Sequence, residues 1–194
     1  MTRIKKDKIK NIKKGFSIME AVISVFVVAV GLTATVSLIV SGLNHSIDSR
    51  NYIIASQLAQ EGVELVRNLR DNNWAVGNVS FDNSASGNFP VGAGDWDNCR
   101  IDKNDTDVKS CNNGADHKKL YYNGNNFYVH TAGAATKFQR KIELDFDTDD
   151  AATANNLTVT SIVIWGSDFP AALADCNVSN KCVYAQSVLT RWGE

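Results

Sequence analysis

One acidic residue, Glu20, stands at the start of an uncharged run from Ala21 to Leu43. Positions 1–15, just before it, hold seven basic residues and one acid, a formal charge of +6. A helix of 23 residues is about 35 Å long and can cross a hydrocarbon core of about 30 Å. An acid at the start of such a helix costs free energy unless something binds it. These features predict an N-terminal membrane helix with a functional carboxylate.

The charge distribution predicts how the chain is oriented. The whole chain sums to −1, so the residues after Gly15 carry about −7. Lysines before a membrane helix hold that end in the cytoplasm, which places the C-terminal part outside. A cleaved secretory signal would have a shorter apolar region followed by a small-x-small site, and residues 32–46 offer no convincing one. The lysines could instead form an arm that binds nucleic acid or anionic lipid. An uncleaved signal anchor is a further alternative, and it accounts for every feature of this segment except Gly15, Phe16 and Glu20.

The segment from Lys13 to about Leu43, which begins KKGFSIMEAVISVFVV, resembles the N-terminus of type IV prepilins. That family includes the type II secretion pseudopilins. The resemblance implies that a prepilin peptidase cuts after Gly15 on the cytoplasmic side. It also implies that Phe16 becomes the N-methylated first residue, with Glu20 fifth in the mature chain.

The chemistry of the motif agrees with that implied role. Cleavage would release an amine on Phe16, one helical turn from Glu20 and on the same face. Each ion alone is costly in lipid, whereas the two together relieve each other. The family implies that Glu20 meets the amine of a neighbouring subunit and sets the axial register of a filament. If Glu20 were only a first-turn carboxylate, the helix dipole would stabilise it by about 0.3–1 kcal/mol. This gain is smaller than the cost of about 2.5–3.5 kcal/mol for a charge in the middle of a membrane.

The apolar run departs from the family in one respect. Many major pilins have a proline in this helix, but here no proline precedes Pro90. This argues against an abundant shaft subunit. The segment GFSIMEAVISVFVVAVGLTA resembles the PilV-like minor pilins more closely.

Beyond Leu43 the helical period continues in an amphipathic form. Apolar residues recur at spacings of seven and four, which predicts a stripe that packs against another element. Its members are Ile47, Ile54, Leu58, Leu65 and Leu69. The predicted domains are a leader at 1–15, a helix at 16–70 (16–43 transmembrane, 44–70 amphipathic) and a head at 71–194. A coiled-coil stalk is an alternative for the second half.

The head is expected to form an antiparallel sheet packed on the striped helix, so the fold class is α+β and pilin-like. Apolar residues around the turn-forming segment 123–126 predict a hairpin. Alternation predicts a half-buried strand over Phe138–Phe146, with Arg140 as an exception. Further strands are predicted at Leu157–Trp165 and Val183–Trp192. Phe81, Phe89 and Trp96 are expected to anchor a long loop-rich region.

All four cysteines lie in the head, at Cys99, Cys111, Cys176 and Cys182. This placement favours disulfides formed outside the cytoplasm. Three connectivities are open, of which we favour the local pairs Cys99–Cys111 and Cys176–Cys182. Zinc is the competing interpretation, but no C-x-x-C pair or histidine set accompanies these residues.

Two acidic segments could hold calcium, although neither has the complete twelve-residue loop. They comprise Asp102, Asn104, Asp105 and Asp107 in one, and Asp145, Asp147, Asp149 and Asp150 in the other. Solvated acidic loops are the simpler interpretation, so no metal or cofactor is predicted.

No motif of hydrolases, metalloproteases or phosphate-binding loops occurs, and we expect no enzyme. The expected function is that of a minor pilin or pilin-like subunit. Its implied partners are the prepilin peptidase, other pilins, an inner-membrane assembly platform and, before assembly, membrane lipid. The expected location is the inner membrane, then a surface pilus.

Two other functions stay open. One is a type II secretion pseudopilin, which would not appear outside the cell. The other is a tip adhesin whose aromatic residues bind glycans by stacking: Trp74, Trp96, Tyr121 and Tyr122. Nucleic-acid binding is not predicted because the head is acidic, although five cations could form a local patch: Lys118, Lys119, Lys137, Arg140 and Lys141.

Overall fold

The computed structural model describes residues 15, 17–77, 81, 89, 96–109, 111, 118–125, 127–131, 133–148 and 153–191. The chain divides after Ile47 into two compact units. The fold class is α+β, as expected, with one long helix and an antiparallel sheet of six strands. The second unit contains the sheet together with the part of the helix that packs on it.

Helix α1 runs from Ile18 to Ala75 without a break. The sequence predicted an end near residue 70, where Asp71, Asn72 and Asn73 follow. The helix instead continues to Ala75. Gly77, two residues further on, has a φ of 88° in the left-handed region, and its N–H donates to the Trp74 carbonyl at 2.9 Å. Glycine adopts this conformation without the steric cost of a Cβ, so it ends the helix where the polar residues do not.

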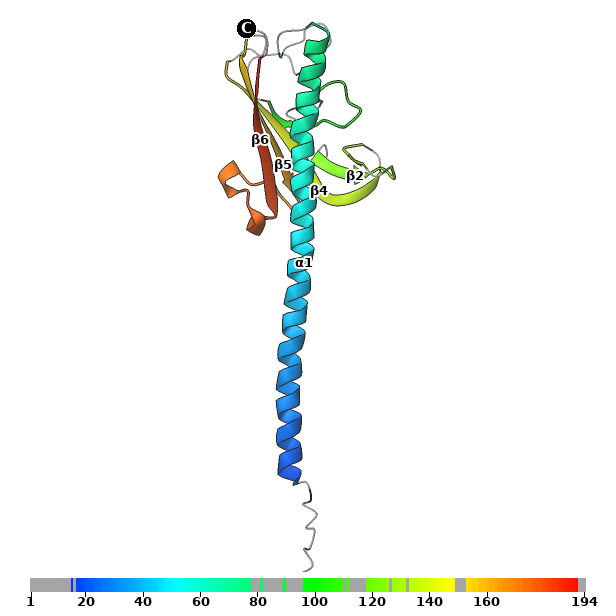
Figure 1. Cartoon of the computed structure of the whole chain (residues 1–194), viewed down its shortest axis with the longest axis vertical. Helices are drawn as coiled ribbons and strands as arrows, with labels where there is room; N and C mark the ends of the chain where they lie inside the picture. The colour runs from blue at the N-terminus through cyan, green and yellow to red at the C-terminus, as the bar shows by residue number, and fades with distance from the viewer. Residues whose placement is uncertain are drawn as a thin grey trace, which may run out of the picture. The chain divides into compact units, whose positions relative to one another are not determined.

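The sheet has the strand order β3-β2-β4-β5-β6, and β1 pairs with the other part of β4. The strands are β1 (Trp96–Cys99), β2 (Lys119–Tyr122), β3 (Tyr128–Val129), β4 (Ala134–Phe146), β5 (Asn156–Ile164) and β6 (Cys182–Thr190). Two short 3₁₀ helices, η2 (Leu173–Asp175) and η3 (Val178–Asn180), lie between β5 and β6. Figure 1 shows β4, β5 and β6 side by side. Strand β5 pairs along its whole length with β6 and from Leu157 onward with β4, so these three strands form the continuous part of the sheet.

The predicted strands and hairpin are confirmed. Strands β2 and β3 pair with Tyr121 opposite Val129. The Asn123 side chain accepts the N–H groups of Asn125 and Phe127 at 3.1 and 3.2 Å, which closes the turn between them. Asparagine suits this position because its side chain substitutes for a backbone acceptor.

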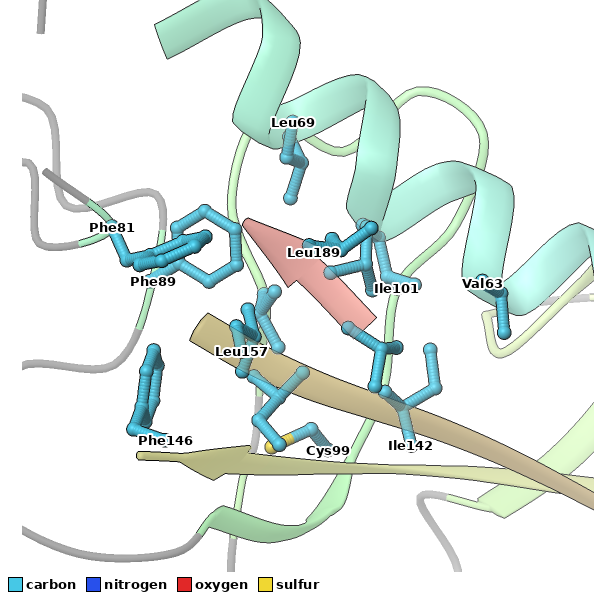
Figure 2. Packing of buried hydrophobic residues seen from close by; sticks show 14 of the residues in the cluster. Val63, Leu69, Phe81, Phe89, Cys99, Ile101, Ile142, Phe146, Leu157 and Leu189 are labelled. Atoms are coloured by element: carbon cyan, nitrogen blue, oxygen red, sulfur yellow. The ribbon is translucent and has the colours of Figure 1, made fainter. Parts of the chain in front are cut away.

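The core lies between one face of α1 and one face of the sheet. In Figure 2, Val63 and Leu69 of α1 point toward Ile142, Leu157 and Leu189 of β4, β5 and β6. The predicted anchors Phe81 and Phe89 join this cluster, at 2% and 1% exposure, whereas Trp96 is only partly buried against it.

The predicted stripe on α1 is partly wrong. Leu58 and Leu69 are buried, but Ile47 is 54% exposed, and Ile54 and Leu65 lie at the flank. The buried face centres on small residues together with the larger apolar ones. It consists of Asn51, Ala55, Leu58, Ala59, Gly62, Val63, Val66, Leu69, Arg70 and Asn73. Small side chains let the helix backbone approach the sheet closely, and a pattern based on large apolar residues overlooks them.

Candidate functional site

The first candidate site is the apolar part of α1. Every residue from Ile18 to Arg50 is exposed, including Phe26 at 68% and Leu38 at 75%. Soluble monomers rarely expose contiguous apolar surface of this extent. The segment is long and apolar enough to cross a membrane, and it fits membrane anchoring.

Polar side chains within this segment bond to the helix itself. The Ser24 hydroxyl donates to the Glu20 carbonyl at 2.7 Å, and that of Thr35 donates to the Gly31 carbonyl at 2.8 Å. Thr33 donates to the Val30 carbonyl at 2.9 Å. An unsatisfied polar group in lipid costs several kcal/mol, so these bonds make the hydroxyls compatible with a hydrocarbon environment.

Glu20 lies in the first turn of α1 and is exposed. Among the residues that the structure describes, no hydrogen bond or ion pair reaches its carboxylate, although the Ala21 N–H bonds to the Ser17 carbonyl at 3.1 Å. Gly15 is also exposed, and a side chain at this position would have no neighbouring atom within 4 Å among the described residues. Phe16, the third residue of the predicted processing site, lies outside the described residues. In the part of the chain that the structure describes, the Glu20 carboxylate is therefore accessible at the helix surface.

The second candidate site is a polar cluster inside the head, centred on Arg140 of β4. Arg140 has no exposed surface. Its guanidinium donates to the carbonyls of Leu58 at 3.2 Å and Ile101 at 2.8 Å, and lies 3.5 Å from the Glu61 carboxylate. One side chain thus ties β4 to α1 and to the loop after β1.

The same loop is fixed by a carboxylate–imidazole pair. Asp102 accepts the backbone N–H of His130 at 3.0 Å, and its Oδ1 lies 2.7 Å from His130 Nδ1. His130 Nε2 lies 3.4 Å from the Arg140 carbonyl. The imidazole therefore connects Asp102 to the backbone of β4.

Electrostatics keep this pair in defined charge states. Burial lowers the pKa of His130 and the Arg140 charge adds to this, against the opposing effect of the Asp102 hydrogen bond. Burial alone would raise the pKa of Asp102, but the hydrogen bonds from His130 and the nearby charges bring it below its ordinary value. At neutral pH the pair is therefore an ionised carboxylate and a neutral imidazole.

Sequence reasoning noticed Arg140 only as an exception to strand alternation and placed it in a surface basic patch, which is wrong because it is buried. The available signal was an arginine at an inward-facing strand position, which needs buried acceptors. Nothing in the sequence linked Arg140 to Asp102 or His130.

The structure contains two disulfides, Cys99–Cys111 and Cys176–Cys182, the local pairs that the sequence favoured. The first fastens the end of β1 to the loop that follows Lys109. The second closes the segment that holds η3 before β6 begins. Because disulfides persist in oxidising compartments, both are consistent with a head outside the cytoplasm.

The acidic residues considered for calcium have other partners in the described part of the chain. Asp105 pairs with Lys109 at 2.9 Å, and Asp147 accepts the backbone N–H groups of Asn155 and Asn156. Within the described residues, no three His, Cys, Asp or Glu side chains are grouped as metal ligands would be. Asp149 and Asp150 lie outside these residues.

Several of the basic and aromatic residues considered for ligand binding contact other side chains of the head. Lys141 pairs with Glu143, and the ammonium groups of Lys141 and Lys118 lie 5.4 and 5.2 Å from the Phe169 ring centre. The Arg70 guanidinium lies 4.6 Å from the Trp74 ring centre. Tyr122 is 38% exposed and packs edge-on against Tyr128.

Comparison of the chain with protein-family models, with curated proteins and with solved structures found no match. The functional argument therefore depends on the sequence motif and on the geometry described above.

Proposed function

We propose that the chain is a precursor of a minor pilin or pilin-like subunit of a type IV pilus or related filament. A prepilin peptidase removes residues 1–15, and Phe16 becomes the methylated N-terminus. The apolar part of α1 first anchors the subunit in the inner membrane, with the head outside, and then packs among other subunits. The subunit performs no catalysis in this proposal.

The observation that carries the proposal is the register of Gly15, Phe16 and Glu20 at the entrance of an exposed apolar helix. A signal anchor needs apolar length alone, and Glu20 would give it only the small gain of a first-turn carboxylate. A subunit that leaves lipid for a filament needs a directional contact, which an amine and a carboxylate provide in a low-dielectric environment.

The head supports the same function. Its half of α1 packs on the sheet, and Arg140 of β4 contacts the Glu61 carboxylate and the Leu58 carbonyl of that helix, so the head is fixed to the helix rather than joined by a flexible linker. The head would therefore move together with the part of α1 on which it packs.

Mass spectrometry of the mature N-terminus tests the proposal. The full chain, extracted from membranes of cells with a prepilin peptidase, should begin at Phe16 with one added methyl group. A Gly15→Val variant should remain uncut, whereas Thr2→Val, a matched change in the leader, should be processed normally. Recovery of a chain that still begins at residue 1 in both parent and Thr2→Val would contradict the proposal.

The pilus and the secretion pseudopilus share this N-terminus, so processing does not separate them. Antibody labelling of intact cells does: a pilus subunit is found in sheared surface fibres, whereas a pseudopilus subunit stays within the envelope.

A further inference from the structure

The pattern Asn-x-Ser/Thr, the acceptor pattern for N-linked saccharides, occurs five times in the sequence. The asparagines are Asn44, Asn78, Asn104, Asn156 and Asn177. Such a short pattern arises often by chance, so the local structure has to decide which asparagine is accessible to a transferase.

Three of the five are committed to other structure. Asn44 lies within α1. The Asn156 amide in β5 donates to Asp147 at 2.9 Å. Asn177 caps η3: its Oδ1 accepts the Asn180 N–H at 3.1 Å, and its Nδ2 donates to the Asp175 carbonyl at 3.2 Å. Asn78 lies outside the described residues.

Asn104 differs from these three. The Asp105 N–H donates to the Asp102 carbonyl at 2.9 Å, so the chain reverses with Asn104 in the turn. Asn104 and Thr106 are exposed, and within the described residues the Asn104 side chain makes no hydrogen bond. Its amide nitrogen can therefore be reached from solvent, with the Thr106 hydroxyl two residues on.

A hollow of about 300 Å³ adjoins Asn104, at the lower end of volumes for small-ligand sites. Its lining includes Phe127, Asn123 and Thr131. Phe127 is 42% exposed, and the Lys103 ammonium lies 3.9 Å from its ring centre. An apolar ring beside polar side chains suits a sugar, which has both C–H faces and hydroxyl groups.

We propose that Asn104 is a site of N-linked glycosylation and that the first sugar lies against this hollow. The donor is a saccharide linked to a membrane lipid through pyrophosphate. The Asn104 amide nitrogen bonds to the sugar C1, the bond from C1 to the pyrophosphate oxygen breaks, and the lipid pyrophosphate leaves. One amide proton passes to a base of the transferase.

This inference requires a head outside the cytoplasm but not assembly into a filament. The disulfides support that location independently of the prepilin motif. Failure of the processing experiment above would therefore leave the glycosylation proposal standing, and the converse also holds.

The test uses the full chain made in cells that supply a polyprenyl-pyrophosphate oligosaccharide and its periplasmic transferase. Intact-protein mass and peptide mapping are compared for the parent, N104Q, T106A, T106S, N177Q and N156Q. The parent should gain the mass of one oligosaccharide on the peptide that contains Asn104. N104Q and T106A should lose it, whereas T106S, N177Q and N156Q should keep it.

Disulfide status, measured by alkylation before and after reduction, confirms that each variant has folded. A parent of unmodified mass would overturn the proposal, as would a saccharide that persists in folded N104Q or maps to Asn177.

Discussion

The two halves of α1 have the same backbone conformation and opposite surroundings. Between Ile18 and Ile47 no side chain is buried, whereas ten residues between Asn51 and Asn73 are. The first half is apolar all round. The second has a narrow buried face of small and apolar residues, together with Glu61, which pairs with a buried arginine. The difference shows that one helix is suited to two environments, an apolar one such as lipid in its first half and a folded head in its second.

The largest expected effect concerns the half that the head holds. Arg140→Ala removes the guanidinium that joins α1, β4 and the loop at Ile101, and leaves Asp102 without a nearby cation. Breaking such a buried ionic cluster costs about 3–5 kcal/mol. Urea unfolding of the full chain in detergent, followed by tryptophan fluorescence, measures this, since all four tryptophans lie between residues 74 and 192.

Arg140→Met is the matched control, because it fills much of the space without the charge and should cost less than Arg140→Ala. Membrane association should be unchanged in both variants. Equal stability of Arg140→Ala and the parent would show that the cluster does not hold the helix.

A charge placed in the other half should act on insertion alone. Leu32 is 61% exposed in the middle of the apolar run, and aspartate at the centre of a membrane helix costs about 2.5–3.5 kcal/mol. Leu32→Asp should therefore shift the chain out of the carbonate-resistant membrane fraction. Val188→Asp, at an exposed site of β6, is the control and should leave the amount of chain in the membrane fraction unchanged. If Leu32→Asp also leaves it unchanged, the apolar half of α1 does not lie in lipid.

A smaller effect tests how closely the helix approaches the sheet. A Cβ on Gly62 would clash with the Ser161 hydroxyl oxygen, so the neighbouring atoms would have to move. Overpacking of this kind costs about 1–3 kcal/mol, so Gly62→Ala should lower the urea midpoint. Adding Ser161→Gly should recover part of the loss, whereas Gly42→Ala, which has open space around it, should have little effect.

Acid should weaken the head. The pKa of His130 is lowered in the folded head, so the unfolded chain binds this proton more readily, and stability falls as the pH drops below the ordinary histidine value near 6.5. The lowered pKa of Asp102 acts in the same direction at more acidic pH. The urea midpoint should decline between pH 7.5 and 5, and less so in His130→Gln; an identical decline in that variant would assign the effect to other groups.

The same comparison explains what the sequence could predict. The apolar run, the strands from residue 134 onward and the hairpin follow from composition and periodicity, which act locally. The buried face of α1 was predicted only in part. Ala55, Ala59 and Gly62 lie on it because their small side chains let the helix pack closely on the sheet, and a pattern of large apolar residues does not detect them. In the cluster of Arg140, Asp102 and His130, the contacts to the loop after β1 are long-range: Asp102 and His130 are 28 positions apart, and Arg140 and its acceptor Ile101 are 39 apart. No local pattern encodes contacts over such separations.

The central claim is that the Glu20 carboxylate finds its partner in assembly. The direct measurement compares Glu20→Gln with the parent for incorporation into sheared surface filaments, with N-terminal processing and membrane anchoring verified by mass spectrometry and fractionation. We expect a variant that is anchored yet incorporated at least about tenfold less, the factor that corresponds to 1.4 kcal/mol, since losing a buried ion pair costs more. Incorporation equal to that of the parent would contradict the account.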